Sequence, residues 1–530
     1  MIKSDLSLRE DYWETLEITE ADINYLYNYL IELERPMPIR DLAQALIHSR
    51  INQIKESLEK RQEHAEKVYL PKESYEIGET LIFPAIEWSR GKIVGKRPGV
   101  NPEVPPFDVI DVALEDGVTR SFASGVEEHV LNNPVEVSVE SDAADADAIL
   151  SQYGESIASK LRDEIFENPD LIAIADKWFP KALLVDVNIG YLNLAEALLD
   201  MEGGGPLTTD AILKQIDLPT DVNPELTAFS LDYAMNEDDR FDEVGATGEV
   251  VWYLNRLEPE WVQNKPVYLQ YQAIEYNEEE IQALKGSLSR TIIDDLEMLQ
   301  DTAASSDDVT LSLIYPHWRS GSLPLAPEIT HLFPTALLSP RVQFTFVDGD
   351  TGKRFSGWVV RPNHYIGGLS EWFEEQGVIP GSLIQLHKGE RMGEVIINVN
   401  RRRSAREWVR TALASADGGL VFAMLKQLVS TDIDERTAVF VPDVELLDKQ
   451  WSRNKTGKYE LTRILIHMMT ELVKLNPQGH VHLEELYAAV NLRFRCPPGL
   501  LLSILMENPW ASHMGDLYFN LNREHLDKSK

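Results

Sequence analysis

The sequence has a single cysteine, Cys496, and no long apolar run. One cysteine cannot form a disulfide bond within the chain or build a cysteine-based zinc site, which fits a reducing compartment. No stretch reaches the length of about eighteen apolar residues that a membrane-spanning helix needs. The first residues, MIKSDLSLRE, also lack the apolar core of a signal peptide. We therefore expect a cytoplasmic protein with no membrane partner.

Positive charge is scarce as well. The chain has 50 lysine and arginine residues against 87 aspartate and glutamate residues, a formal net charge of −37. Because nucleic-acid affinity comes largely from neutralising phosphates, such a chain is repelled by DNA unless its basic residues gather on one surface. The negative charge instead favours a basic protein partner, or a protein assembly that itself binds DNA.

Catalytic motifs are missing too. The sequence contains no His-Glu-x-x-His, no Gly-x-Ser-x-Gly, no phosphate-binding loop and no dinucleotide fingerprint. Asp108, Asp111 and Glu115 lie near an expected strand, but the lysine that follows such carboxylates in a metal-dependent nuclease is absent. We predict a non-enzymatic protein with no cofactor and no bound metal. The absence of these local motifs leaves open an active site assembled from residues that are distant in sequence.

What is present is typical of a multidomain α+β protein. A chain of 530 residues is too long for one core, so we expect about three to five domains. Its hydrophobic fraction of 43% and charged fraction of 26% are ordinary for globular proteins. The fold class we predict combines winged helix-turn-helix modules, a small SH3-like barrel and a β-pseudobarrel.

The most informative stretch is residues 308–403. β-Branched and aromatic residues recur there at period two, which predicts strands at residues 311–314, 342–347, 355–360, 383–386 and 395–399. Asp348 and Gly349 lie between two of these runs and predict a hairpin turn, since glycine tolerates the positive φ of tight turns. Residues 368–376 have helical character. We therefore predict a strand-rich module.

This order of features resembles the DNA-binding pseudobarrel family, which includes plant B-three-type transcription-factor domains and the effector domain of EcoRII-like restriction enzymes. The matching features are the SLPL stretch at residues 322–325, the Phe-Pro step at 333–334, the hairpin into 355–358, and residues 365–373 with the Pro-Gly turn after them. These are packing and turn residues rather than chemical groups.

In that family the barrel faces the DNA major groove with arms at its strand ends. The resemblance therefore implies nucleic-acid contacts at Arg319, Lys353, Arg354, Arg361, Lys388 and Arg391. The residues themselves add the basic run Arg401, Arg402 and Arg403, since arginine can bridge phosphates or bind guanine through two hydrogen bonds. Lysine and arginine that are merely solvated would show the same pattern, so both interpretations stay open.

The N-terminal part predicts two small domains. Residues 1–66 contain three helical segments, the first with Thr19 as a plausible N-cap, and predict a helix-turn-helix-like domain, although a helical hairpin without a binding role would look the same. Residues 67–135 contain four short strand patterns and predict an SH3-like or Tudor-like barrel. That segment resembles the RNA-polymerase-interacting barrel of CarD-type transcription factors, which implies RNA polymerase as a partner. Residues 136–148 form an acidic linker.

Two further segments predict winged helices. Residues 149–258 contain helical patterns, Asn223-Pro224 as a helix start, and two strands around Gly245 to Gly248, and they resemble the winged-helix modules of the HARE family. Residues 457–530 repeat the pattern, with GHVHLEELYAAV beside GPLTTDAILKQI and GDLYFNLNR beside GEVVWYLNR.

Charge distinguishes the two copies. The presumed recognition helix of the first copy carries Glu225 and Asp232 and no basic residue, so a protein-binding or structural role is favoured over groove insertion. The second copy has Arg493 and Arg495 just before its third helix, which leaves nucleic-acid contact open. Residues 259–307 and 404–456 are predicted to be helical connectors.

Three functions are compatible with this organisation. The first is a nucleic-acid-associated protein that binds DNA, the transcription apparatus or both. The second is an acidic protein–protein interaction scaffold. The third is the target-recognition component of a restriction or defence system whose nuclease is on another chain. The oligomeric state does not follow from the sequence.

Overall fold

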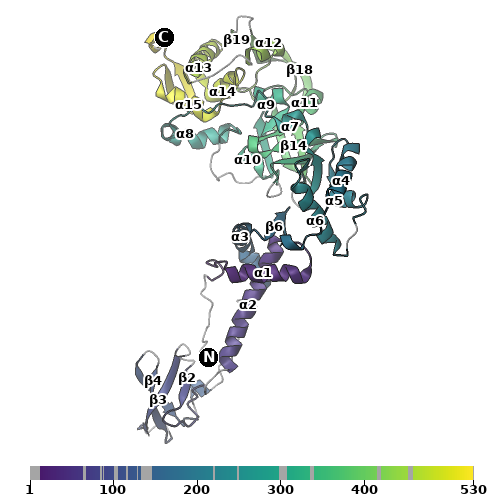
Figure 1. Cartoon of the computed structure of the whole chain (residues 1–530). Coiled ribbons are helices and arrows are strands. Elements are labelled where there is room, and N and C mark those ends of the chain that lie inside the picture. The colour runs from purple at the N-terminus through teal and green to yellow at the C-terminus, as the bar shows by residue number, and fades with distance from the viewer. Residues whose placement is uncertain are drawn as a thin grey trace. The chain divides into compact units, whose positions relative to one another are not determined.

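A computed structural model describes residues 12–63, 67–83, 86, 89–100, 105–114, 117–127, 129–132, 146–218, 221–246, 250–297, 307–334, 339–414, 419–451 and 458–528. The predicted acidic linker lies almost wholly outside these residues. The chain divides into two compact units, Met1–Leu184 and Val185–Lys530, and both contain helices and sheets (Figure 1). The predicted α+β class is therefore confirmed. None of the described helices is both long and apolar enough to cross a membrane.

The first unit contains a module that is discontinuous in sequence. Its elements are α1 (Glu20–Leu33), β1 (Met37–Pro38), α2 (Ile39–Glu63), α3 (Ala146–Phe166), β6 (Leu171–Ile174) and β7 (Lys177–Pro180). Helix α3 packs on α2, and the three strands form an antiparallel sheet in the order β1-β7-β6. The module therefore crosses the predicted domain boundaries at residues 66 and 149, because α3 and its strands complete the module that α1 and α2 begin.

A four-stranded sheet is inserted between α2 and α3. Its strands are β2 (Thr80–Phe83), β3 (Ser89–Pro98), β4 (Asp108–Leu114) and β5 (Thr119–Ser124), paired antiparallel in sequence order. The four strands match the four predicted runs. Tyr69, Phe83 and Phe122 pack against one another in its core.

The second unit repeats the order of the discontinuous module twice. The first of these repeats consists of α4 (Ile189–Met201), β8 (Leu207–Thr208), α5 (Thr209–Leu213), α6 (Pro224–Asn236), β9 (Phe241–Glu243) and β10 (Val251–Leu254). The other consists of α13 (Lys458–Val473), β20 (His480–His482), α14 (Leu483–Val490), α15 (Pro498–Glu507), β21 (Ala511–Gly515) and β22 (Tyr518–Leu521). Their sheets have the orders β8-β10-β9 and β20-β22-β21.

The three modules, called first, second and third in chain order, also share a strand register. In each, a buried aromatic residue of the last strand pairs with an apolar residue of the short first strand. The pairs are Trp178 with Met37, Trp252 with Leu207, and Phe519 with Val481. The chain therefore contains one α-β-α-α-β-β arrangement three times, and the first copy is interrupted by the four-stranded sheet.

A seven-stranded sheet occupies the centre of the second unit. Its strands are β11 (Asp308–Ser312), β12 (Ser322–Pro324), β13 (Arg341–Asp348), β14 (Arg354–Val360), β15 (Tyr365–Gly367), β16 (Leu383–Lys388) and β17 (Glu394–Val399). The order is β11-β16-β17-β13-β14-β15-β12, and only the β13–β17 pair among them is parallel. Four of the five predicted strands are present within two residues at either end, whereas the one predicted at residues 311–314 begins and ends earlier, at Asp308–Ser312. The helices α9 (Tyr315–Ser320), α10 (Pro327–Thr330) and α11 (Ser370–Gln376) lie between strands in sequence.

The turn between β13 and β14 is fixed by Asp348. Its carboxylate accepts hydrogen bonds from the backbone N–H of Thr351 at 2.7 Å and from the indole N–H of Trp372 at 2.7 Å. These bonds hold the pKa of Asp348 below its usual value although burial alone would raise it. The predicted Asp-Gly turn is thus anchored to α11.

The segment after the seven-stranded sheet differs from its prediction. Residues 404–456 were expected to be helical, but β18 (Arg401–Ala414) and β19 (Leu420–Thr431) form a long antiparallel hairpin, and α12 (Val444–Trp451) is a short helix after it. The helical prediction is wrong for the hairpin because cross-strand pairing outweighs the helix preference of its Ala, Leu, Met and Arg residues. The connector before the sheet contains α7 (Glu260–Gln263) and α8 (Glu278–Thr291), as expected.

The core of the third module extends beyond that module. One buried cluster contains Leu501 of α15, Leu288 of α8 and Phe422 of the hairpin. Helix α15 packs directly on α8. The third module is therefore part of a larger core rather than a separate body at the end of the chain.

Candidate nucleic-acid interface

Three of the six cations predicted as contacts in the central module are neutralised. Arg319 pairs with Asp448, with Nη2 to Oδ2 at 2.9 Å, and Lys353 Nζ lies 2.6 Å from Oε1 of Glu375. Arg354 of β14 pairs with Glu394 of β17, across the intervening strand β13. Each positive charge therefore already has a carboxylate partner, which reduces its attraction for a phosphate.

Arg319 and Lys353 also line a cavity of about 580 Å³. Its walls include Trp261, Phe355 and Trp372. The Trp261 ring lies directly over Gly367, where a Cβ atom would come within 2.4 Å of the ring. The connector that carries Trp261 is therefore packed closely onto the sheet.

The other predicted cations of this module lie on separate loops. Arg361 is exposed in the 3-10 turn after β14, whereas Lys388 and Arg391 are exposed at the turn between β16 and β17. Glu390 and Glu394 belong to that same β16–β17 segment. The described structure gives no concentrated cationic face around the central sheet.

The three arginines at the start of β18 differ in their partners. Arg401 bonds to Gln376 and lies 3.9 Å from Asp350. Arg402 lies between Glu407 at 3.2 Å and Asp432 at 3.5 Å. Arg403 is exposed and forms no ion pair with any residue that the structure describes. Of the three arginines, Arg403 keeps its charge unpaired within the described part.

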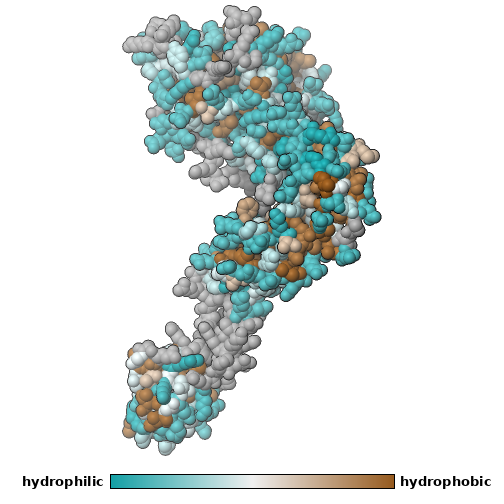
Figure 2. Space-filling view, viewed as in Figure 1, coloured by the Kyte–Doolittle hydropathy of each residue, from teal (hydrophilic) through white to brown (hydrophobic). Residues whose placement is uncertain are grey.

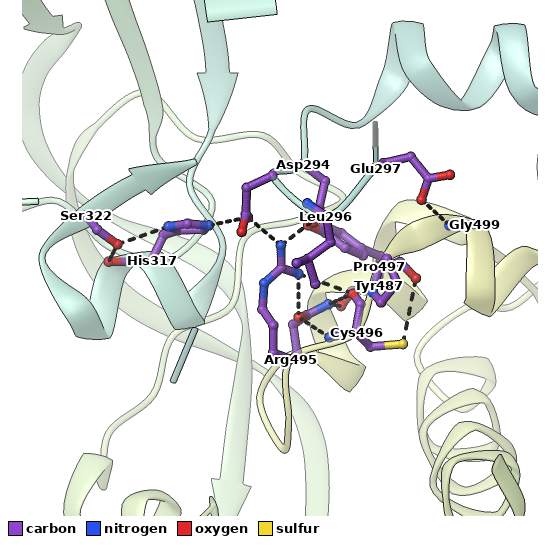
Figure 3. A network of polar contacts seen from close by, with 12 residues as sticks. Asp294, Leu296, Glu297, His317, Ser322, Tyr487, Arg495, Cys496, Pro497 and Gly499 are labelled. Carbon is purple, nitrogen blue, oxygen red and sulfur yellow. Dashed lines mark hydrogen bonds and ion pairs between the residues drawn. The ribbon is translucent and has the colours of Figure 1, made fainter. Parts of the chain in front are cut away.

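Arg495, predicted to contact nucleic acid, is buried within the fold. Its side chain has no exposed surface, and Nη2 lies 2.8 Å from Asp294 and 2.5 Å from Asp295 (Figure 3). Buried charges are tolerated only when they are paired, and this arginine compensates two buried carboxylates. Arg493 is half-buried and donates to Gln450 Oε1 at 2.7 Å, so it too is engaged within the fold.

The carboxylates around Arg495 link three parts of the second unit. His317 of α9 bonds to Asp295 at 2.8 Å, and Tyr487 of α14 donates to Asp294 (Figure 3). Burial alone would raise the pKa of Asp295, but Arg495 and His317 outweigh it and hold that pKa below its usual range. The network therefore fixes the third module against α9 and the segment after α8.

The third helices of the modules do not offer a cationic surface. Helix α15 is buried against α8, with its Gly499 N–H bonded to Glu297 at 3.0 Å. In α6, Asp232 is buried and accepts the indole N–H of Trp252 at 3.0 Å. The exposed residues of α3 include Glu155 and Asp163. None of the three helices, as described, could enter a groove lined by phosphates without repulsion or exposure of the core.

A different surface combines positive charge with aromatic character. On one face of the hairpin Trp408 pairs with Lys426 and Arg406 pairs with Leu428. Trp408 is 63% exposed, Leu428 is 65% exposed, and both cations are exposed. Arg406 and Lys426 form no ion pair within the described residues, and the Lys426 ammonium lies 5.4 Å from the centre of the Trp408 ring. We call these four residues, with Met424 on the same face and the exposed Arg403 earlier on the same strand, the hairpin surface; Arg403 lies within the break in register between Arg401 and Ala405 and is not assigned to the Trp408 face.

The sequence contained a signal for this surface that the helical interpretation hid. Arg406 and Trp408 are two residues apart, as are Met424, Lys426 and Leu428, and period two places each set on one face of a strand.

The chain matches no family model, no curated protein and no solved structure, so no known relative bears on the role of this surface.

Proposed function

We propose that this chain is a non-enzymatic, cytoplasmic, nucleic-acid-associated protein whose contact with the polyanion is made by the hairpin surface. The observation that carries the proposal is the segregation of charge. Arg403, Arg406 and Lys426 are exposed without a carboxylate partner among the described residues, in a chain with a net charge of −37. A local concentration of unpaired cations is what an acidic protein needs to hold phosphates.

In this proposal the three α-β-α-α-β-β modules are winged helices, the four-stranded sheet is an SH3-like barrel, and the seven-stranded sheet is a β-pseudobarrel. Their element and strand orders support these assignments. The modules serve packing and protein contacts, since their third helices are buried or acidic. RNA polymerase, or another protein that works on DNA, is the partner that such an architecture suits.

Fluorescence anisotropy with a labelled mixed-sequence oligonucleotide tests the proposal. With three cations engaged, the logarithm of the association constant should fall with the logarithm of salt concentration at a slope of about −2 to −3. The proposal is wrong if the full chain at micromolar concentration binds neither single-stranded nor duplex DNA or RNA at about 50 mM salt.

The alternative function is an acidic scaffold for protein contacts. Helix α4 exposes Ile189, Leu194 and Met201, the last at 83%. Figure 2 shows brown, apolar residues gathered over the α4 to α6 region, whereas hydrophilic residues dominate the rest of the second unit on the face drawn. Affinity capture after nuclease treatment distinguishes the two functions, because a scaffold keeps its partners when nucleic acid is removed.

A target-recognition role in a restriction or defence system is the remaining alternative. It depends on the seven-stranded sheet reading DNA, and three of the candidate cations of that module, Arg319, Lys353 and Arg354, are paired with carboxylates. The hairpin proposal makes no use of those cations, and we favour it for that reason.

A further inference from the structure

We infer that the hairpin surface binds single-stranded rather than duplex nucleic acid, with an unstacked base against Trp408. This inference rests on the proposed function and specifies the form of its ligand. It starts from one face of the hairpin, on which each exposed cross-strand pair joins one apolar and one cationic side chain.

The geometry places an apolar strip between cations. Leu428 lies across from Arg406, Lys426 lies across from Trp408, and Met424 follows on the same face. Trp408, Leu428 and Met424 are all exposed, at 63%, 65% and 42%. Exposed apolar side chains that gather on one face mark a binding surface more often than scattered ones do.

The opposite face of the hairpin also exposes apolar side chains, Leu413, Val421 and Leu425, but it carries a carboxylate beside its cation. Glu407 points to that side by the alternation of the strand, and it pairs with Arg402 at 3.2 Å. The cation on that side is therefore neutralised, while Arg406 and Lys426 on the Trp408 side are not. The ligand should bind the Trp408 face.

A single strand satisfies both kinds of side chain at once. Its phosphates can pair with the two cations, and its unstacked bases offer flat apolar faces to Trp408 and to the aliphatic chains beside it. The ammonium of Lys426 near the indole shows that one face of the ring accepts a cation and that the ring is reachable from outside the fold.

A duplex satisfies them poorly. A two-stranded ribbon that enters the major groove reads base edges through hydrogen-bonding side chains, and Trp408, Leu428 and Met424 have no such groups for bidentate reading. A duplex also carries about one charge per 1.7 Å of axis, roughly twice the charge density of one strand. An acidic protein with few free cations is repelled more strongly by the denser charge.

The experiment compares a labelled dT oligonucleotide of about twenty nucleotides with its dT·dA duplex on the full chain, by fluorescence anisotropy. We expect the single strand to bind at least about tenfold more tightly. Trp408→Ala should weaken it about 5- to 100-fold, the range of one lost base-stacking contact. Trp408→Phe should recover most of that loss. Tyr459→Ala removes an equally exposed aromatic residue of α13 and should change nothing.

Each outcome has a distinct meaning. If the wild-type chain binds neither nucleic acid, the proposed function fails and this inference fails with it. If the duplex binds as tightly as the single strand, or if Trp408→Ala binds normally while its thermal unfolding is unchanged, this inference is overturned and the proposed function stands. If polyglutamate displaces the oligonucleotide at equal charge concentration, the surface is a site for acidic peptides, and both are overturned.

Discussion

Replacing Arg495 by methionine tests the role of the buried network. In the wild-type chain Arg495 Nη2 lies 2.8 Å from Asp294 Oδ1 and 2.5 Å from Asp295 Oδ1. Methionine keeps most of the apolar volume of the arginine side chain but leaves both carboxylates buried without their cation. Breaking a buried pair in this way costs about 3–5 kcal/mol. For a unit of this size, the unfolding temperature should fall by about 4–7 °C.

The pH dependence of the loss gives a sharper test. In the wild-type chain Asp295 has a lowered pKa, so its contribution is present above its unfolded-state value near 4 and is lost as pH falls below it. In Arg495→Met, burial without the cation raises that pKa, so the carboxyl destabilises the fold more as pH rises above about 4. The difference between the two proteins should therefore be smaller at pH 5 than at pH 7.5.

Thermal unfolding followed by circular dichroism at both pH values measures this difference. The matched control is Arg463→Met, which removes an exposed arginine whose Nη1 lies 3.5 Å from Glu460 on the same helix. It should have almost no effect. The reasoning is refuted if Arg495→Met behaves like the control, or if its loss of stability is larger at pH 5 than at pH 7.5.

Two further predictions concern the contacts of the central sheet. Burial raises the pKa of Glu243 to about 8, with Asp242 and Asp232 nearby and Ser339 bonded to it. Because the folded-state pKa lies above the unfolded one, stability from this group is present below about pH 4.5 and is lost as pH rises toward 8. Glu243→Gln should therefore stabilise the chain by about 1–3 kcal/mol at pH 8 and by much less at pH 5. Urea titrations at the two pH values measure this difference, and an equal effect at both would contradict the prediction. Gly367→Ala should lower the free energy of unfolding by about 1–3 kcal/mol, because its Cβ would meet the Trp261 ring. Gly286→Ala in α8 is the control, since its Cβ would meet open space, and it should be neutral or stabilising. Equal effects of the two variants in urea titrations would count against the packing described.

Local patterns in the sequence predicted much of the secondary structure. The strands of the central sheet and of the four-stranded sheet follow from period-two runs, because alternate burial on a sheet needs that spacing. The repeat between the second and third modules followed from matching turns and terminal strands. The first copy escaped detection because an inserted sheet separates α2 from α3, and the pairing of Met37 with Trp178 leaves no trace in local periodicity.

The candidate site was harder to predict than the fold. Arg495 looked like an available cation because its partners, Asp294 and Asp295, are about two hundred residues away in sequence. Ala, Leu, Met and Arg favour helices and so predict a helix for the hairpin segment, although its sequence also contains Asp417-Gly418-Gly419, which is typical of a tight turn. Ion pairing and cross-strand register both depend on the tertiary fold, and these two features decide which cations remain free.

The most direct test of the central claim compares two sets of charge removals in the full chain. One variant replaces Arg403, Arg406 and Lys426 of the hairpin surface by alanine, and the other replaces Arg319, Lys353 and Arg354 of the central module. The account predicts that the hairpin variant loses about tenfold or more in affinity for a labelled oligonucleotide at low salt, with a salt slope shallower by about two to three, while the central-module variant binds like the wild type. Unchanged binding by the hairpin variant, or loss confined to the central-module variant, would contradict it.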